Sequence, residues 1–118
     1  PPLPILYDGT VGCYVEMLEM SGGHGGDNLP KSQALKDACM AHNISVNLPE
    51  KGIFIHYNGA FHSQNKDGIA WYLRQTNPEL KVLTIDATEQ DDINHLDEER
   101  VGMADFIIAT PSNLTKTH

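Results

Sequence analysis

Basic residues are scarce in this 118-residue sequence. Eight Lys and Arg stand against 16 Asp and Glu, which gives a formal net charge of −8. A surface that follows nucleic-acid phosphates needs the opposite sign, and an anionic membrane surface is disfavoured for the same reason. Nor does any apolar run approach the roughly 18 residues of a membrane-spanning helix. We therefore expect no nucleic-acid partner.

Cysteine and the common catalytic motifs are also nearly absent. Cys13 and Cys39 have no Cys-x-x-Cys partner, so we interpret both as free thiols that only an oxidising compartment would pair. There is no nucleophile elbow, Walker loop, Gly-x-Gly-x-x-Gly or His-Glu-x-x-His pattern. With six His, four Tyr and four Met beside these absences, the composition favours binding over turnover.

The sequence does not begin with methionine. Residues 1–9 read as a proline-stiffened connector, and residues 111–118 read as a polar tail. We expect the chain to be a processed or cloned piece of something longer, so part of a functional site can lie outside it. A length of 118 residues suits one domain.

Helical and strand patterns alternate along the chain. Apolar spacing predicts helices over residues 10–20, 32–48 and 67–76, with Ser32 as the N-cap of the second. That second helix is apolar on so much of its circumference that more than one neighbour should cover it. Compact apolar runs predict parallel, neighbouring strands over residues 53–58, 80–86 and 105–109. The expected fold class is α/β, a mainly parallel sheet with flanking helices.

Ligands of such sheets bind beyond the carboxyl ends of the strands. The first predicted strand ends at Tyr57-Asn58-Gly59, and His62 follows after the glycine has let the chain turn. An imidazole at His62 can face a cleft, bind a metal or shuttle a proton; the alternative is a loop histidine that hydrogen-bonds the turn. We expect His62 to be partly accessible. We expect His56, inside the apolar run, to be enclosed and hydrogen-bonded.

Other candidate ligands have two interpretations each. Tyr57 either ligates ferric iron as a phenolate or is a packed ring. His24, in SGGHGG, is either an incidental loop histidine or a reachable ligand on a flap that closes over a bound molecule. Met17 and Met20 either line a flat apolar pocket or belong to the core.

Two motifs resemble a known family. KDACMAHNI, residues 36–44, is similar to the basic-Asp-x-x-Met-Ala-x-x-Ile helix of the ChaN-like proteins. NGAFHSQNKDGIAWYL, residues 58–73, resembles the Asn-Gly-x-x-His stretch that follows a central strand in that family. KVLTIDA and ADFIIATP fall where its next two strands would lie, so the resemblance covers residues 11–112. These proteins are haem-binding, iron-regulated lipoproteins of the bacterial cell envelope, in the Tiki superfamily, which also includes metal-dependent peptidases and erythromycin-esterase-like enzymes.

The resemblance is partial. The family's N-terminal Gly-Glu-x-His-like motif is absent, so residues 1–118 are either a single α/β domain or the C-terminal half of one, a fragment of a larger Tiki-type domain. The family's haem-iron ligand is a tyrosine, which motif position does not locate among Tyr7, Tyr14, Tyr57 and Tyr72. Only His62 carries over by position.

The function that the resemblance implies is a non-catalytic haem-binding module of an iron-uptake protein, with His62, Tyr57, Gly59 and His24 at the site. It also implies a lipid anchor outside this chain, on the periplasmic side of the cell envelope, and an outer-membrane haem receptor as partner. A truncated domain would expose apolar residues and could form a homodimer to cover them. The alternative is a metal-dependent hydrolase or peptidase that holds a divalent metal at His62, with further ligands in a missing N-terminal half. A third hypothesis is a fragment that only supports a site carried elsewhere.

Overall fold

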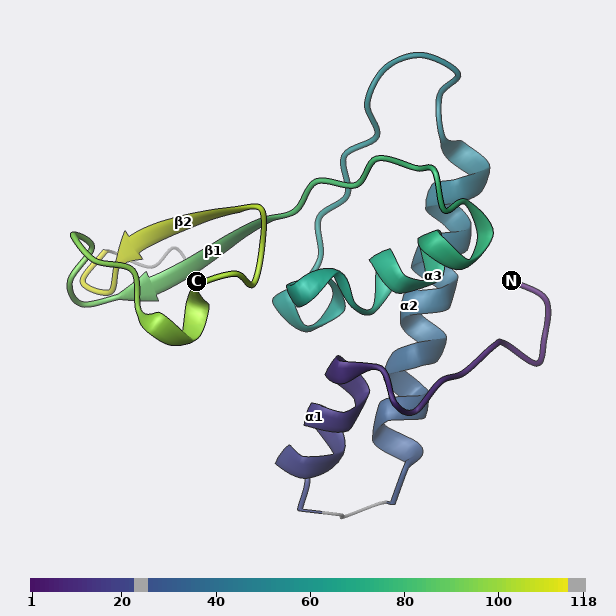
Figure 1. The fold of residues 1–118 in the computed structure, drawn as a ribbon, viewed down its shortest axis with the longest axis horizontal. Helices are drawn as coiled ribbons and strands as arrows, with labels where there is room; N and C mark the ends of the chain where they lie inside the picture. The colour runs from purple at the N-terminus through teal and green to yellow at the C-terminus, as the bar shows by residue number, and fades with distance from the viewer. Residues whose placement is uncertain (23–25, 115–118) are drawn as a thin grey trace.

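The computed structural model describes residues 1–22 and 26–114. Within these residues the α-helices are α1 (Gly12–Met20), α2 (Asn28–Asn47) and α3 (Ile69–Thr76). The strands are β1 (Ile85–Gln90) and β2 (Phe106–Pro111), and the 3₁₀ turns are η1 (Ala60–His62), η2 (Gln64–Lys66) and η3 (Glu98–Arg100). The helices gather into one body, and the strands project from it as an arm (Figure 1). The fold is therefore mixed α/β with a parallel sheet, as the sequence predicted.

The core of the molecule is built on α2. Its buried face is a stripe of small apolar side chains three or four residues apart, completed by one larger residue: Ala34, Ala38, Ala41 and Ile44. Because these side chains are small, both α1 and α3 can pack closely against the same helix. Coverage of α2 by more than one neighbour is thus confirmed. The remaining buried cluster comes from the other helices and the turn before α1: Val11, Cys13, Tyr14, Ile69, Tyr72 and Leu73.

The start of α2 differs from our prediction. The helix begins at Asn28, with Asp27 as its N-cap, and not at Ser32. Pro30 lies in the first turn, where the missing N–H of proline costs no helical hydrogen bond. Lys31 Nζ also reaches Asp27 Oδ2 at 2.7 Å, one turn along the helix. Pro30 therefore lies inside the first turn of α2 and does not precede the helix.

The parallel sheet contains two strands among the described residues. β1 and β2 pair in register from Ile85↔Phe106 to Gln90↔Pro111, so parallel pairing is confirmed for the two later strands. β1 starts later than the predicted 80–86 because Leu80 and Val82 pack against the helical core. Contact with β2 begins at Thr84, whose carbonyl oxygen accepts from Phe106 N–H at 3.1 Å.

The predicted strand over residues 53–58 is wrong. This segment is extended but pairs with no described strand, and no backbone hydrogen bond joins residues 53–57 to another described residue. Ile53 and Ile55 are 86% and 71% exposed. An apolar run becomes a strand only when a neighbour supplies the ladder of N–H and C=O partners. No neighbouring strand lies beside this run in the described part of the chain.

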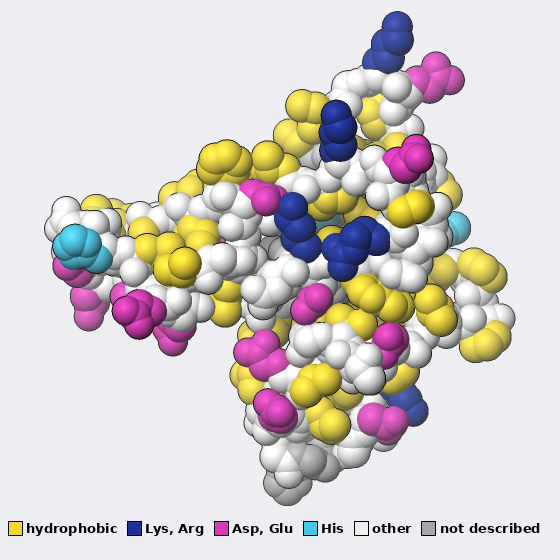
Figure 2. Space-filling view, in the orientation of Figure 1, with side chains coloured by type: hydrophobic (Ala, Val, Ile, Leu, Met, Phe, Trp, Pro, Cys, Tyr) yellow, Lys and Arg dark blue, Asp and Glu magenta, His cyan; other side chains and the backbone are white. Residues whose placement is uncertain are grey.

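The arm joins the helical body through the turns before α3. Asn65 N–H donates to Met103 O at 2.7 Å, and Lys66 Nζ lies 3.0 Å from Asp105 Oδ2. The predicted flanking helices are present, but α2 and α3 pack chiefly on one another and not on the strands. Lys and Arg side chains gather near the place where the arm meets the helices (Figure 2). No helix in residues 1–22 and 26–114 is long and apolar enough to cross a membrane.

Candidate functional site

A buried carboxylate links three elements at the centre of the site. Asp37, on α2, is completely buried. Tyr14, on α1, donates its hydroxyl proton to Asp37 Oδ2 at 2.7 Å. His62, at the end of η1, places Nδ1 2.5 Å from Asp37 Oδ1. Both carboxylate oxygens are thus occupied, one by a phenol and the other by an imidazole.

The position of His62 depends on the turns that frame it. Its N–H donates to Gly59 O at 3.0 Å, and Asn58 Nδ2 donates to Ser63 Oγ at 3.0 Å. The site thus sits at a 3₁₀ turn against α1 and α2, and not at the end of a strand. The side chain of His62 is 21% exposed, which confirms the predicted partial accessibility.

Gly68 is the glycine that this site requires. Its φ is +55°, and an added Cβ would lie 2.5 Å from His62 O and 3.1 Å from Asp37 Oδ2. Gly59 has φ −67° and ψ 150°, dihedrals that any residue adopts, so the turn does not depend on its freedom. Sequence reasoning credited the turn to Gly59 and overlooked Gly68.

A glutamine completes the surroundings of His62. Gln33, nearly buried on α2, places Nε2 2.8 Å from His62 Nδ1 and 3.4 Å from His62 Nε2. Burial raises the pKa of Asp37 above its ordinary value, while the hydrogen bonds from Tyr14 and His62 act in the opposite direction. The pKa of Tyr14 is raised, first by burial and then by the Asp37 carboxylate. Tyr14 is therefore a neutral phenol that donates to Asp37.

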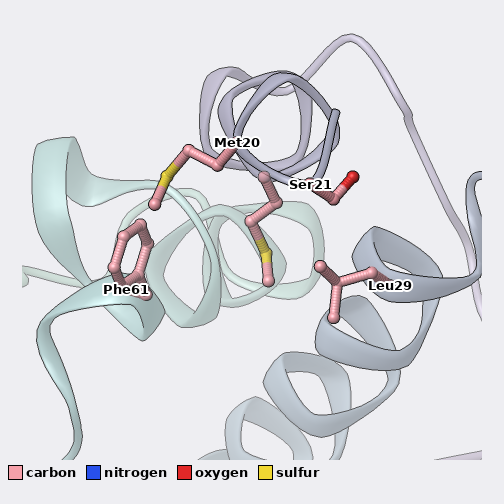
Figure 3. A pocket seen from close by; sticks show the side chains of 5 residues that line it. Met20, Ser21, Leu29 and Phe61 are labelled. Carbon is pink, nitrogen blue, oxygen red and sulfur yellow. The ribbon is translucent and has the colours of Figure 1, made fainter. Parts of the chain in front are cut away.

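A shallow apolar pocket adjoins this network. Its volume is about 210 Å³, and it is lined by Met17, Met20, Ser21, Leu29 and Phe61. The thioether of Met20, on α1, points toward Phe61, and Leu29 lies on the other side of the opening (Figure 3). Phe61 immediately precedes His62, and Leu29 lies one helical turn before Gln33. The pocket is therefore near His62, although His62 does not itself line it. Of the two interpretations of Met17 and Met20, the pocket holds for both residues, and Met17 packs against the core as well.

A second hollow, of about 400 Å³, lies between the N-terminal segment and helices α2 and α3. His42 and Tyr72 are among its lining residues. The Tyr72 hydroxyl is already used, since it donates to Leu6 O at 2.7 Å, and burial raises the pKa of Tyr72 to about 12. The larger hollow thus has an exposed histidine but lacks the buried carboxylate that accompanies His62.

The other predicted site residues are not brought to His62. Tyr57 is 91% exposed, and no contact joins it to the Asp37 network. The prediction that His56 is enclosed is wrong: it is exposed, with Nδ1 3.1 Å from Asn58 Oδ1. His56 is exposed because the segment that contains it pairs with no described strand. His24 lies outside the described residues.

Sequence reasoning missed Gln33 and Asp37 as site residues, and it considered Tyr14 only as one of four tyrosines that could ligate haem iron. Asp37 lies within the motif that resembles the family. It was overlooked because a charged residue on a helix is usually exposed to solvent. A signal was present: Asp37 is three residues after Ala34 and four before Ala41, so it lies in the buried alanine stripe. A carboxylate in an apolar stripe needs partners, and Tyr14 and His62 are those partners.

The comparisons with known proteins agree with the two motifs. The family described as haem-binding uptake, Tiki superfamily, ChaN, matches residues 9–73, more than half of the chain. The match spans α1, α2 and most of α3, including all the residues around Asp37. No curated protein and no solved structure matches the chain. The chain belongs to the ChaN family of haem-binding uptake proteins in the Tiki superfamily.

Proposed function

We propose that this chain is the haem-binding module of a bacterial cell-envelope iron-uptake protein, and that it carries haem without transforming it. The observation that supports the proposal is the apolar pocket of Met17, Met20, Leu29 and Phe61 beside His62. Thioether, aliphatic and aromatic side chains suit the face of a porphyrin. An imidazole whose Nδ1 is held by a carboxylate is the usual arrangement of a metal-ligating histidine.

The size of the pocket limits what it can hold. At about 210 Å³ it is smaller than the roughly 300–1,000 Å³ of pockets that enclose a drug-sized ligand. It can therefore cover only part of a porphyrin, and a second surface must cover the rest. We propose that a second copy of this chain supplies that surface in a homodimer.

The proposed iron ligand of tyrosine type is Tyr57. Tyr14 and Tyr72 donate their hydroxyl protons internally, and burial raises the pKa of Tyr7, so these three are poor sources of phenolate. The Tyr57 hydroxyl has no hydrogen-bond partner among the described residues and is open to solvent. His62 would line the haem or ligate it, and the absence of a side chain at Gly59 leaves the approach to His62 Cδ2 open. His24 is proposed as a further contact.

Membership of a haem-uptake family supports a cell-envelope setting. In that setting the chain would lie on the periplasmic side, lipid-anchored in the full-length protein, and would accept haem from an outer-membrane haem receptor. The net charge of −8 fits a role away from nucleic acid.

A haemin titration tests this function. Haemin added to the chain should give a saturable, shifted Soret band, and Tyr57→Phe should alter that spectrum while Tyr7→Phe leaves it unchanged. A Soret band identical to that of free haemin at every ratio would exclude haem binding by this chain. Equal spectra for Tyr57→Phe and the parent would remove Tyr57 from the ligand set.

The second candidate function is a metal-dependent hydrolase of the Tiki type. The His62–Asp37 pair supports it, because a carboxylate-oriented histidine also serves hydrolytic metal sites and general bases. Stoichiometric zinc or manganese, together with chelator-sensitive turnover of peptides or esters by the full-length protein, would favour this candidate. Haemin binding without turnover would favour the carrier.

A further inference from the structure

We propose that Asp37 is a positioning residue that fixes the tautomer of His62, with the proton on Nδ1 and the lone pair on Nε2. The proposal deepens the haem-binding function, on which it rests for the identity of the ligand. The tautomer itself can be measured without any ligand. Four side chains joined by hydrogen bonds determine this tautomer: His62, Asp37, Tyr14 and Gln33.

The first step concerns the proton between His62 and Asp37. A separation of 2.5 Å between Nδ1 and Oδ1 requires a hydrogen between them, because two lone pairs at that distance repel. An ionised carboxylate only accepts hydrogen bonds, so the proton belongs to Nδ1. In a neutral imidazole the other nitrogen is then the acceptor.

Gln33 would favour the opposite tautomer. Its Nε2 lies 2.8 Å from the same Nδ1, and an amide N–H there would need a lone pair on Nδ1. One ring nitrogen cannot donate to Asp37 and accept from Gln33 at once. The charge-assisted bond is shorter and roughly twice as strong as a neutral one, so Asp37 sets the proton position. Gln33 then turns its amide oxygen toward Nδ1–H, since the two ends of an amide exchange by rotation.

Tyr14 explains why Asp37 can perform this task while completely buried. Its hydroxyl donates to Oδ2, which fixes the plane of the carboxylate and keeps Oδ1 for the imidazole. The His62 side chain is 21% exposed, and Asp37 occupies its Nδ1. Nε2, which lies 3.4 Å from Gln33 Nε2, then carries the lone pair that a haem iron or another metal would use.

Nitrogen-15 NMR of the ligand-free chain at neutral pH tests the proposal. His62 should show a protonated-type shift at Nδ1 and an unprotonated-type shift at Nε2. In Asp37→Asn the amide can donate to Nδ1, so the two shifts should exchange, as a carboxylate-to-amide change does in a serine-protease triad. Gln33→Leu, the matched control beside the same nitrogen, should keep the parent pattern. Parent protein with the proton on Nε2 would overturn the proposal, whether or not Asp37→Asn folds.

Haemin binding provides the second readout. Asp37→Asn should weaken haemin affinity about 10–100-fold, the usual cost of losing the partner of a metal-ligating histidine, and His42→Ala, at an exposed residue of the same helix, should not. A parent chain that has the Nδ1–H tautomer but binds no haemin would contradict the proposed function alone. Exchanged tautomers in Asp37→Asn with unchanged haemin affinity would overturn the link between Asp37 and the ligand.

Discussion

Two histidines six residues apart have opposite surroundings. His62 contacts the buried Asp37, whereas His56 is exposed and hydrogen-bonds the nearby Asn58 side chain. His62→Ala should therefore lower the free energy of unfolding by about 1–3 kcal/mol, because it removes a partner from a buried carboxylate. His56→Ala should leave the free energy of unfolding nearly unchanged. Urea unfolding followed by circular dichroism measures both values, and equal losses would show that the Asp37 contact adds nothing to stability.

Buried acidic protons make the molecule sensitive to alkali. Burial raises the pKa of the Cys13 thiol to about 11 and that of Tyr72 to about 12, from ordinary values of 9.0 and 10.0. Both groups keep their protons longer when folded, so their contribution to stability is complete below pH 9 and is lost as the pH rises through 11 to 12. Urea midpoints should fall steadily between pH 9 and pH 11.

Replacement of the buried thiol checks this pH profile. Cys13→Ala should flatten it, because burial is the main cause of the raised pKa of Cys13. A midpoint that stays constant from pH 8 to pH 11 would contradict the burial of these protons.

At the scale of elements, the entry into α3 should tolerate no side chain. Gly68 precedes α3 with φ +55°, and a Cβ there would clash with His62 O. Gly68→Ala should therefore cost at least the roughly 1–2 kcal/mol of a left-handed backbone, plus the displacement of His62. Gly59→Ala is the control, because its φ is −67° and its nearest new contact is 3.9 Å away. Thermal unfolding of the two variants compares them, and equal midpoints would refute the role of Gly68.

Helix positions could be predicted because they depend mostly on local patterns. Apolar spacing located α1, α2 and α3, and Pro78 correctly limited α3 to residues before Asn77. The start of α2 was misplaced because proline is compatible with both the first helical turn and the segment before it. Each of these outcomes follows from sequence neighbours within about one helical turn.

Strand 53–58 and the Asp37 network could not be predicted locally. A strand depends on a partner strand that may be far away in the sequence, and the apolar run at Ile53 and Ile55 found none in the described chain. The network joins Tyr14, Asp37 and His62, which are 23 and 25 residues apart in successive pairs. No short window contains such a site, so only His62 was anticipated by its motif.

At the scale of the whole molecule, apolar surface remains uncovered on both the arm and the extended segment. One face of the sheet exposes Ile85, Phe106 and Ile108 at 62%, 60% and 54%, and Ile53 and Ile55 are more exposed still. Contiguous apolar surface of this kind favours association. The chain should therefore show a mass above that of the monomer in light scattering at high protein concentration.

Charged substitutions locate the associating surface. Ile53→Lys with Ile55→Lys should lower the measured mass without changing the thermal midpoint, because neither side chain contacts the core. Leu3→Lys, at a similarly exposed residue of the N-terminal segment, is the control and should leave association unchanged. A strictly monomeric parent at all concentrations would contradict the predicted self-association.

Haemin binding should require His62 and not His42. His62 lies beside the pocket of Met17 and Phe61, and His42 lines the larger hollow beneath the N-terminal segment. Haemin affinity should be measured by Soret titration for the parent, His62→Ala and His42→Ala, each with its fold checked by circular dichroism. The account predicts saturable binding by the parent, at least tenfold weaker binding by folded His62→Ala, and unchanged binding by His42→Ala. Unchanged affinity in His62→Ala, or a loss confined to His42→Ala, would contradict it.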